Sequence, residues 1–196
     1  EAIPEWLDRI APAYHDPRVA AAGGPINVKW LGPPPEWVLP LDCFGHLDLG
    51  STLKELSWPE CIFGGNFTVR KHLLYKVGGF NPDTAVEDRL VGDGELGLCK
   101  KVYKAGYKIV YVPDALVYHV QKGDRVTLQS IKHRFAQQGR CNAYADHKQN
   151  QYSFPGLLLR TSLTLTLACM TLLQAFTHIH SKPPEYFRHI VRYEAR

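Results

Sequence analysis

Residues 92–120, GDGELGLCKKVYKAGYKIVYVPDALVYHV, contain the pattern that decides the fold class. The first part, 95–106, has apolar residues at helical spacing and ends on a glycine, as many helices do. Its predicted inner stripe consists of Leu96, Cys99, Val102 and Tyr103. Two short β segments follow, 107–113 and 115–120, on either side of a Pro-Asp turn. A helix that alternates with strands over short loops predicts an α/β layer fold.

The segments before and after this stretch continue the alternation. Before it, we expect a helix over 4–15, a strand over 18–30 broken at Gly23-Gly24-Pro25, and a proline-rich loop over 32–40. An apolar segment with a glycine turn over 61–70, a short helix over 70–77 and an acidic loop over 81–95 should follow. After it, we expect a polar helix over 127–149. In the first helix, Trp6, Leu7 and Ile10 are predicted to share the inner face.

Composition excludes several classes of protein. Of the 196 residues, 45% are hydrophobic and 21% charged, which is ordinary globular usage and unlike disordered, collagenous or coiled-coil chains. Lys+Arg 23 against Asp+Glu 19 leaves +4, an excess too small to indicate nucleic-acid binding. The five cysteines are isolated and predict free thiols in a reducing compartment: Cys43, Cys61, Cys99, Cys141 and Cys169.

The C-terminal part differs from the rest of the chain in composition. Residues 154–180 form a mostly apolar stretch that contains Arg160 and several threonines. We expect a helix that is inserted in a membrane or lies on it, with a buried or amphipathic helix as the alternative. Residues 181–196 are basic and are predicted to form a juxtamembrane helix that suits an anionic cytoplasmic surface.

Two short motifs could carry chemistry. Gly64-Gly65-Asn66 ends an apolar segment; the glycines let a ligand approach the backbone, and the asparagine can donate and accept hydrogen bonds. A tight turn between strand and helix is the alternative. Asp93 and Glu95 open the predicted helix, where the macrodipole favours ionised carboxylates and a general base could lie. Plain helix capping is the alternative there.

His119 lies at the end of a short apolar strand and could ligate a metal ion through a neutral ring nitrogen. A hydrogen-bonded structural histidine is the other interpretation. Arg140, on the late polar helix, could meet an anionic ligand or be an ordinary exposed charge.

Taken in order, these pieces resemble the C-terminal half of family 2 glycosyltransferases, which have the GT-A (nucleotide-diphospho-sugar transferase) fold. The resemblance runs from residue 3 to about residue 140. IPEWLDRIAPAYHDPRVAAAGG resembles the segment that follows the metal-binding DxD, and CIFGGNFTVRKHLLYKVGGFNPD resembles the acceptor-side GGN turn with its helix. GDGELGLCKKVYKAGYKIVYVPDALVYH resembles the catalytic block, and HRFAQQGR the helix after it.

In that family an acidic pair opens the helix that ends in AGY, and the Asp of the pair is the general base. Counting back from Gly106 without a gap puts Glu95 at the base position and Gly94 at its partner. A shift of two residues would select Asp93, and Asp88 is a third and more distant candidate. The chain therefore departs from the usual Glu-Asp pair.

The resemblance implies inverting, metal-dependent transfer of a sugar from a nucleotide-sugar to a glycan or lipid-linked hydroxyl. It implies Mn²⁺ or Mg²⁺, with His119 completing the metal shell, and Gly64, Gly65, Asn66 and Arg140 around the substrates. It also implies polysaccharide biosynthesis in the cell envelope, at the cytoplasmic face of the inner (plasma) membrane. The fold expected is thus half of a GT-A domain over 1–150, with an appended apolar helix.

Two departures qualify this expectation. The nucleotide-binding half with DxD is not in the sequence, so we expect this chain alone to be inactive. QQGRCNAY, starting at Gln137, has no tryptophan where processive synthases have Q-x-x-R-W, which favours single additions. A non-catalytic sugar- or lipid-binding module with a degenerate transferase fold is the main alternative, and a small helical membrane adaptor is another.

Overall fold

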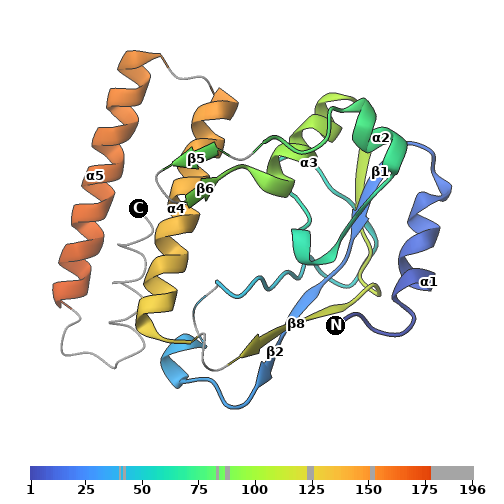
Figure 1. Cartoon of the computed structure of the whole chain (residues 1–196), viewed down its shortest axis with the longest axis horizontal. Helices are drawn as coiled ribbons and strands as arrows, with labels where there is room; N and C mark the ends of the chain where they lie inside the picture. The colour runs from blue at the N-terminus through green and yellow to red at the C-terminus, as the bar shows by residue number, and fades with distance from the viewer. Residues whose placement is uncertain are drawn as a thin grey trace. The chain divides into compact units, whose positions relative to one another are not determined.

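The computed structural model describes residues 1–39, 41, 43–82, 84–86, 89–122, 126–150 and 153–177. The chain divides into two compact units (Figure 1). The first unit comprises Glu1–Leu31, Phe44–Thr84 and Gly92–Gln121, and the second comprises Gly32–Cys43, Ala85–Val91 and Lys122–Arg196. Each unit is therefore assembled from segments that are distant in the sequence.

A mixed four-stranded sheet forms the centre of the first unit. Its order is β3 (Lys54–Glu55), β7 (Lys108–Tyr111), β1 (Val19–Gly23) and β4 (Phe67–Val69). The two central strands, β1 and β7, run parallel, and each outer strand is antiparallel to its neighbour. All five residues of β1 are buried, as expected for a central strand covered on both faces. The predicted α/β class is confirmed.

Helices cover both faces of this sheet. The short helices α1 (Trp6–Ile10) and η1 (Ala11–His15) pack on one face; α2 (Lys71–Lys76) and α3 (Gly94–Lys104) belong to the other (Figure 1). Successive side chains of β7 point to opposite faces of the sheet and so enter two different cores. Ile109 and Tyr111 join the larger core with Leu98 and Val102 of α3, whereas Val110 joins the smaller core on the α1 side.

The predicted helix after residue 94 is confirmed as α3. Gly106, at a φ of 75°, ends it: its amide donates to the Tyr103 carbonyl, and the Tyr107 amide donates to the Val102 carbonyl. The predicted inner stripe is right at Cys99 and Val102 but wrong at one position. Leu98 is fully buried and Leu96 only half-buried, because the face that meets the sheet follows the 98, 99, 102 spacing.

Other predicted elements match with local corrections. The break in the 18–30 strand separates β1 from β2 (Ile26–Leu31), which pairs with β8 (Val117–Lys122), and the first predicted helix begins as α1. Leu7 was placed on the inner face wrongly, since it is exposed. The prediction assumed a continuous α-helix over 4–15. The α-helix instead changes to a 3₁₀ helix at Ala11, so α-helical spacing holds for little more than one turn.

Three short elements fall in segments predicted to be loops. The proline-rich loop contains the 3₁₀ turn η2 (Glu36–Val38). The acidic loop contains the strand pair β5 (Thr84–Val86) and β6 (Arg89–Val91).

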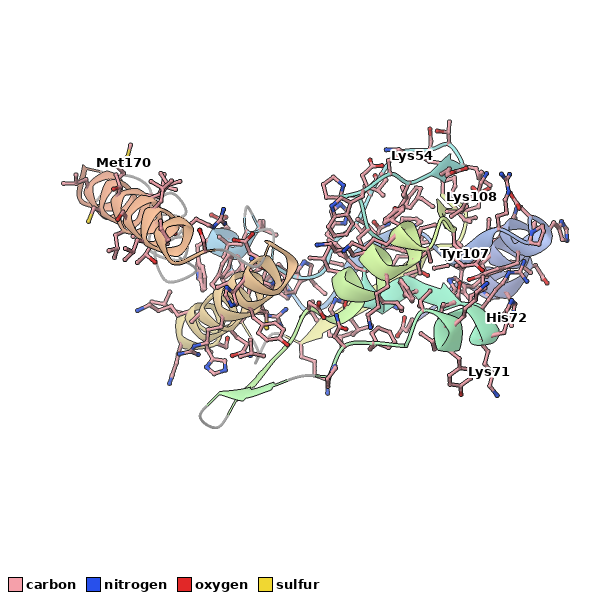
Figure 2. All side chains as sticks on the ribbon, turned by 90° about the horizontal axis from the view of Figure 1, so that it is seen from above. Lys54, Lys71, His72, Tyr107, Lys108 and Met170 are labelled. Carbon is pink, nitrogen blue, oxygen red and sulfur yellow. The ribbon has the colours of Figure 1, made fainter. Side chains whose placement is uncertain are left out.

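The second unit contains the long helices α4 (Leu128–Asn150) and α5 (Phe154–Thr177). Large apolar side chains project from α5 into solvent, as Figure 2 shows around Met170. The exposed ones are Leu158, Leu159, Leu163, Leu165, Leu167, Met170 and Leu173. Within the described ranges, no helix combines the length and apolar character required to cross a bilayer. The predicted basic segment 181–196 lies outside the described residues.

Gly23 tests the packing at the end of β1. A Cβ there would lie 2.1 Å from the Asn66 carbonyl oxygen and 2.8 Å from Cγ2 of Ile62. Gly23→Ala should therefore lower the free energy of unfolding by about 2 kcal/mol or more, the cost of overpacking. Gly64→Ala is the control, because its Cβ would meet nothing closer than 3.4 Å. Urea denaturation measures both variants, and equal midpoints would contradict the packing described.

Candidate active site at the GGN turn

The turn Gly64-Gly65-Asn66 forms the 3₁₀ element η3 (Gly64–Asn66), directly before β4. Asn66 is 2% exposed, and its side-chain amide is fully engaged by the protein. Nδ2 donates to the carbonyls of Pro25 at 2.9 Å and Ala115 at 2.7 Å, and Oδ1 accepts from the Trp6 indole at 3.0 Å. These bonds orient the turn, so the contribution of Asn66 to a site is to position its neighbours.

Glu95 meets this turn from the first helical turn of α3. Its Oε1 accepts a hydrogen bond of 3.1 Å from the backbone N–H of Gly64. Its other oxygen, Oε2, accepts no hydrogen bond from the part of the chain that the structure describes. A Cβ at Gly64 would lie 3.4 Å from Oε2, so the glycine leaves the carboxylate uncovered. Two motifs that lie 31 residues apart thus meet at one half-exposed carboxylate.

Asp93 has a different environment from Glu95. It is 8% exposed, and its Oδ2 accepts a 2.8 Å hydrogen bond from the Asn81 amide. Its Oδ1 is buried and has no hydrogen-bond partner within the described ranges. The carboxylate fills the space beside Gly97, where a Cβ would approach it to 2.3 Å. Asp93 therefore packs against the start of α3, and the geometry favours Glu95 as the carboxylate that can reach a substrate.

The loop before the turn is fastened to α3 along its length. The Trp58 ring packs edge-on against Tyr103, with centroids 6.1 Å apart, and the Tyr103 hydroxyl donates to the Glu60 carbonyl at 3.0 Å. The Cys61 thiol lies 3.8 Å from the Glu95 carbonyl. These contacts fix the approach of the chain to Gly64.

Sequence inspection missed the pairing of two thiols at this place. A hydrogen bond with the Cys99 thiol, together with burial, raises the pKa of Cys61 well above its ordinary value. Cys61 and Cys99 are both free cysteines, and Cys99 is fully buried. The helical position of Cys99, one turn after Glu95, was available from the sequence, but the position of the loop that carries Cys61 was not.

His119 is the third of the six residues of β8, so it lies within the strand and not at its end as predicted. Its Nδ1 is 2.7 Å from the Phe44 carbonyl oxygen and 3.1 Å from Nε2 of Gln121, so Nε2 is the ring nitrogen left for a metal ion. That nitrogen could serve as one ligand. Among the described residues, however, no group of three His, Cys, Asp or Glu could hold a metal ion, so they do not form a complete site for Mn²⁺ or Mg²⁺.

The remaining candidates stay predictions. Arg140 is an exposed residue of α4 in the second unit, whereas the GGN turn and Glu95 belong to the first. Asp88 lies outside the described residues. A Cβ added at Gly65 would lie 3.3 Å from Cδ1 of Ile26, so this glycine faces the core and not the carboxylate.

The hydrogen bonds of the Asn66 side-chain amide should contribute to the stability of the fold. Asn66→Ala would leave two carbonyls and the Trp6 indole without their hydrogen bonds, and each such loss costs about 1–3 kcal/mol. We expect a loss of at least about 3 kcal/mol in unfolding free energy by urea denaturation. Asn142→Ala is the matched control, since Asn142 is exposed on α4. A loss at Asn66 no larger than at Asn142 would contradict the role assigned to its amide.

The environment of Cys61 and Cys99 should make both thiols less reactive than an exposed cysteine. Because the raised pKa of Cys61 keeps it protonated and Cys99 is buried, both should react slowly with iodoacetamide at mildly alkaline pH. The exposed Cys169 should be alkylated at least about tenfold faster, as followed by peptide mass spectrometry. In concentrated guanidinium chloride the difference should vanish. Fast alkylation of Cys61 in the folded protein would refute the pairing.

Comparison with known protein families, with curated proteins and with solved structures finds no match for this chain. The assignment of a function therefore rests on the chemistry of the residues described above.

Proposed function

We propose that this chain carries the acceptor side of an inverting glycosyltransferase with a GT-A fold, in which Glu95 is the general base. The single observation that supports this best is the hydrogen bond between the Glu95 carboxylate and the Gly64 amide. It joins the GGN turn to the acidic start of α3, the two motifs on which the resemblance to family 2 glycosyltransferases chiefly depends.

The geometry suits a base whose orientation is set before the substrate arrives. Oε1 is held by the backbone of a turn that Asn66 anchors in the core, and Oε2 remains available. A positioned carboxylate of this kind can take the proton of an acceptor hydroxyl as its oxygen attacks. The O–H bond breaks toward Oε2, a bond forms between the acceptor oxygen and the anomeric carbon, and the bond to the nucleoside diphosphate breaks.

The roles proposed for the neighbouring residues follow from their contacts. Gly64 supplies the amide that orients the base, Gly65 continues the turn, and Asn66 positions both. Asp93 supports the start of α3 against Asn81. A divalent cation, when bound, would neutralise the departing diphosphate; His119 could offer one ligand and the described residues do not complete its shell.

The wider setting is part of the same proposal. The donor is a nucleotide-sugar, and the acceptor is a glycan or lipid-linked hydroxyl. The enzyme would work in cell-envelope polysaccharide synthesis at the cytoplasmic face of the inner (plasma) membrane, where exposed apolar residues of α5 would contact lipid.

Substitution of the two carboxylates distinguishes their roles. In the full-length protein, Glu95→Gln should lower kcat for sugar transfer at least about a hundredfold, because the glutamine amide cannot accept the proton of the acceptor hydroxyl. Donor binding should be unchanged. Asp93→Asn keeps the shape of the buried side chain and should reduce kcat by less than about tenfold. Release of nucleoside diphosphate from a panel of nucleotide-sugars measures both variants.

Three outcomes decide between the hypotheses. A larger loss at Asp93 than at Glu95 would move the base to Asp93. Transfer that is independent of both residues would refute the proposed base. Sugar binding without any release of nucleoside diphosphate would support a non-catalytic sugar-binding module instead.

A further inference from the structure

Phe63 is a partly exposed aromatic residue that directly precedes Gly64, the residue whose amide binds the proposed base. Its side chain is 39% exposed, although the loop on its N-terminal side is fastened to α3. Hydrogen bonds hold the backbone at Phe63. Its carbonyl accepts from the backbone N–H of Asn66 at 2.9 Å, and the backbone N–H of the next residue, Gly64, donates to Glu95. The ring therefore starts from a backbone position that is fixed relative to the carboxylate.

Other exposed aromatic residues of the first unit lack this position. Tyr75 and Phe80, on α2 and just after it, are 70% and 51% exposed, and within the described ranges neither forms a hydrogen bond to the GGN turn or to Glu95. Trp58 is partly exposed, but its ring lies against Tyr103 and beneath the Lys100 ammonium. Phe63 is thus the aromatic side chain adjacent in sequence to the amide that orients Glu95.

We propose that Phe63 forms a binding platform for the pyranose ring that carries the attacking hydroxyl. This inference rests on the function proposed above and names its acceptor: a sugar, rather than a simple lipid alcohol or an amino-acid hydroxyl. Pyranoses have an apolar face of C–H groups and a polar rim of hydroxyls. An aromatic ring and a carboxylate offer one partner for each, and small-molecule sites likewise combine apolar walls with a few convergent polar groups.

The small residues after Phe63 fit this arrangement. Gly64 and Gly65 add no side chain beyond the Phe63 ring, and a Cβ at Gly64 would lie between the turn and the carboxylate, 3.4 Å from Oε2. A sugar that rests on Phe63 could therefore direct a hydroxyl toward Oε2 without meeting a side chain from these two positions.

Sugar binding to the full-length protein tests the platform directly. The probes are the methyl β-glycosides of glucose, galactose and N-acetylglucosamine, observed by saturation-transfer NMR. We expect saturation to reach the ring C–H protons of at least one of them in the wild type and in Phe63→Tyr, which keeps the ring. It should be largely lost in Phe63→Ala. Phe80→Ala is the matched control and should behave as the wild type does.

Acceptor kinetics supply a second readout. With the accepted sugar as substrate, Phe63→Ala should raise KM about tenfold and change kcat little, the pattern for loss of uniform binding. Because Phe63 is partly exposed, its unfolding midpoint should stay close to that of the wild type, which excludes a folding defect as the cause. Equal binding by the wild type and Phe63→Ala, or equal loss in Phe80→Ala, would overturn the proposal.

Failure of this inference can be separated from failure of the proposed function. Glu95-dependent transfer that is unaffected by Phe63→Ala would refute the platform and leave the transferase intact. Sugar binding that depends on Phe63 without Glu95-dependent transfer would refute the transferase and leave the sugar site. Absence of binding for all three glycosides in the wild type would refute the platform.

Discussion

One buried side-chain amide, that of Asn66, connects several segments of the first unit around the GGN turn. Its hydrogen bonds reach Trp6 of α1, Pro25 after β1 and Ala115 before β8, while its backbone belongs to the GGN turn. A buried amide is stable only when its donors and acceptor are paired, so these segments have to meet with the correct geometry. The direction of the Gly64 amide, and hence the orientation of Glu95, depends on this arrangement.

The start of α3 shows how two nearby carboxylates acquire different properties. The Asp93 carboxylate packs against Gly97 and accepts a hydrogen bond from the Asn81 amide, so it belongs to the interior of the unit. The Glu95 side chain, two residues later, extends toward the turn. Each carboxylate has one oxygen without a partner in the described structure, but that of Asp93 is buried and the Glu95 carboxylate is half-exposed. Differences of environment of this kind allow one carboxylate to support a site and another to react with substrate.

Much of the α/β layer followed from local signals. The glycine at 106 ends α3, and the predicted break in the first strand falls at Gly24 and Pro25, between β1 and β2. The strand pair β5 and β6 was missed, because segments of three residues carry too little periodicity to distinguish strand from loop. Leu7 was misplaced, since helical spacing predicts a face only while the α-helix continues.

The sequence by itself determined where elements begin and end and which residue types could carry chemistry, because caps, turns and periodic apolar residues act over a few positions. It indicated the GGN turn and both carboxylates, but left open which carboxylate is available. Only the tertiary structure decided that Glu95 meets Gly64, that Cys61 meets Cys99 and that Asn66 is committed to the core. These pairings join segments about thirty or more residues apart, and their geometry is set by the packing of α3 and the turn on a shared sheet.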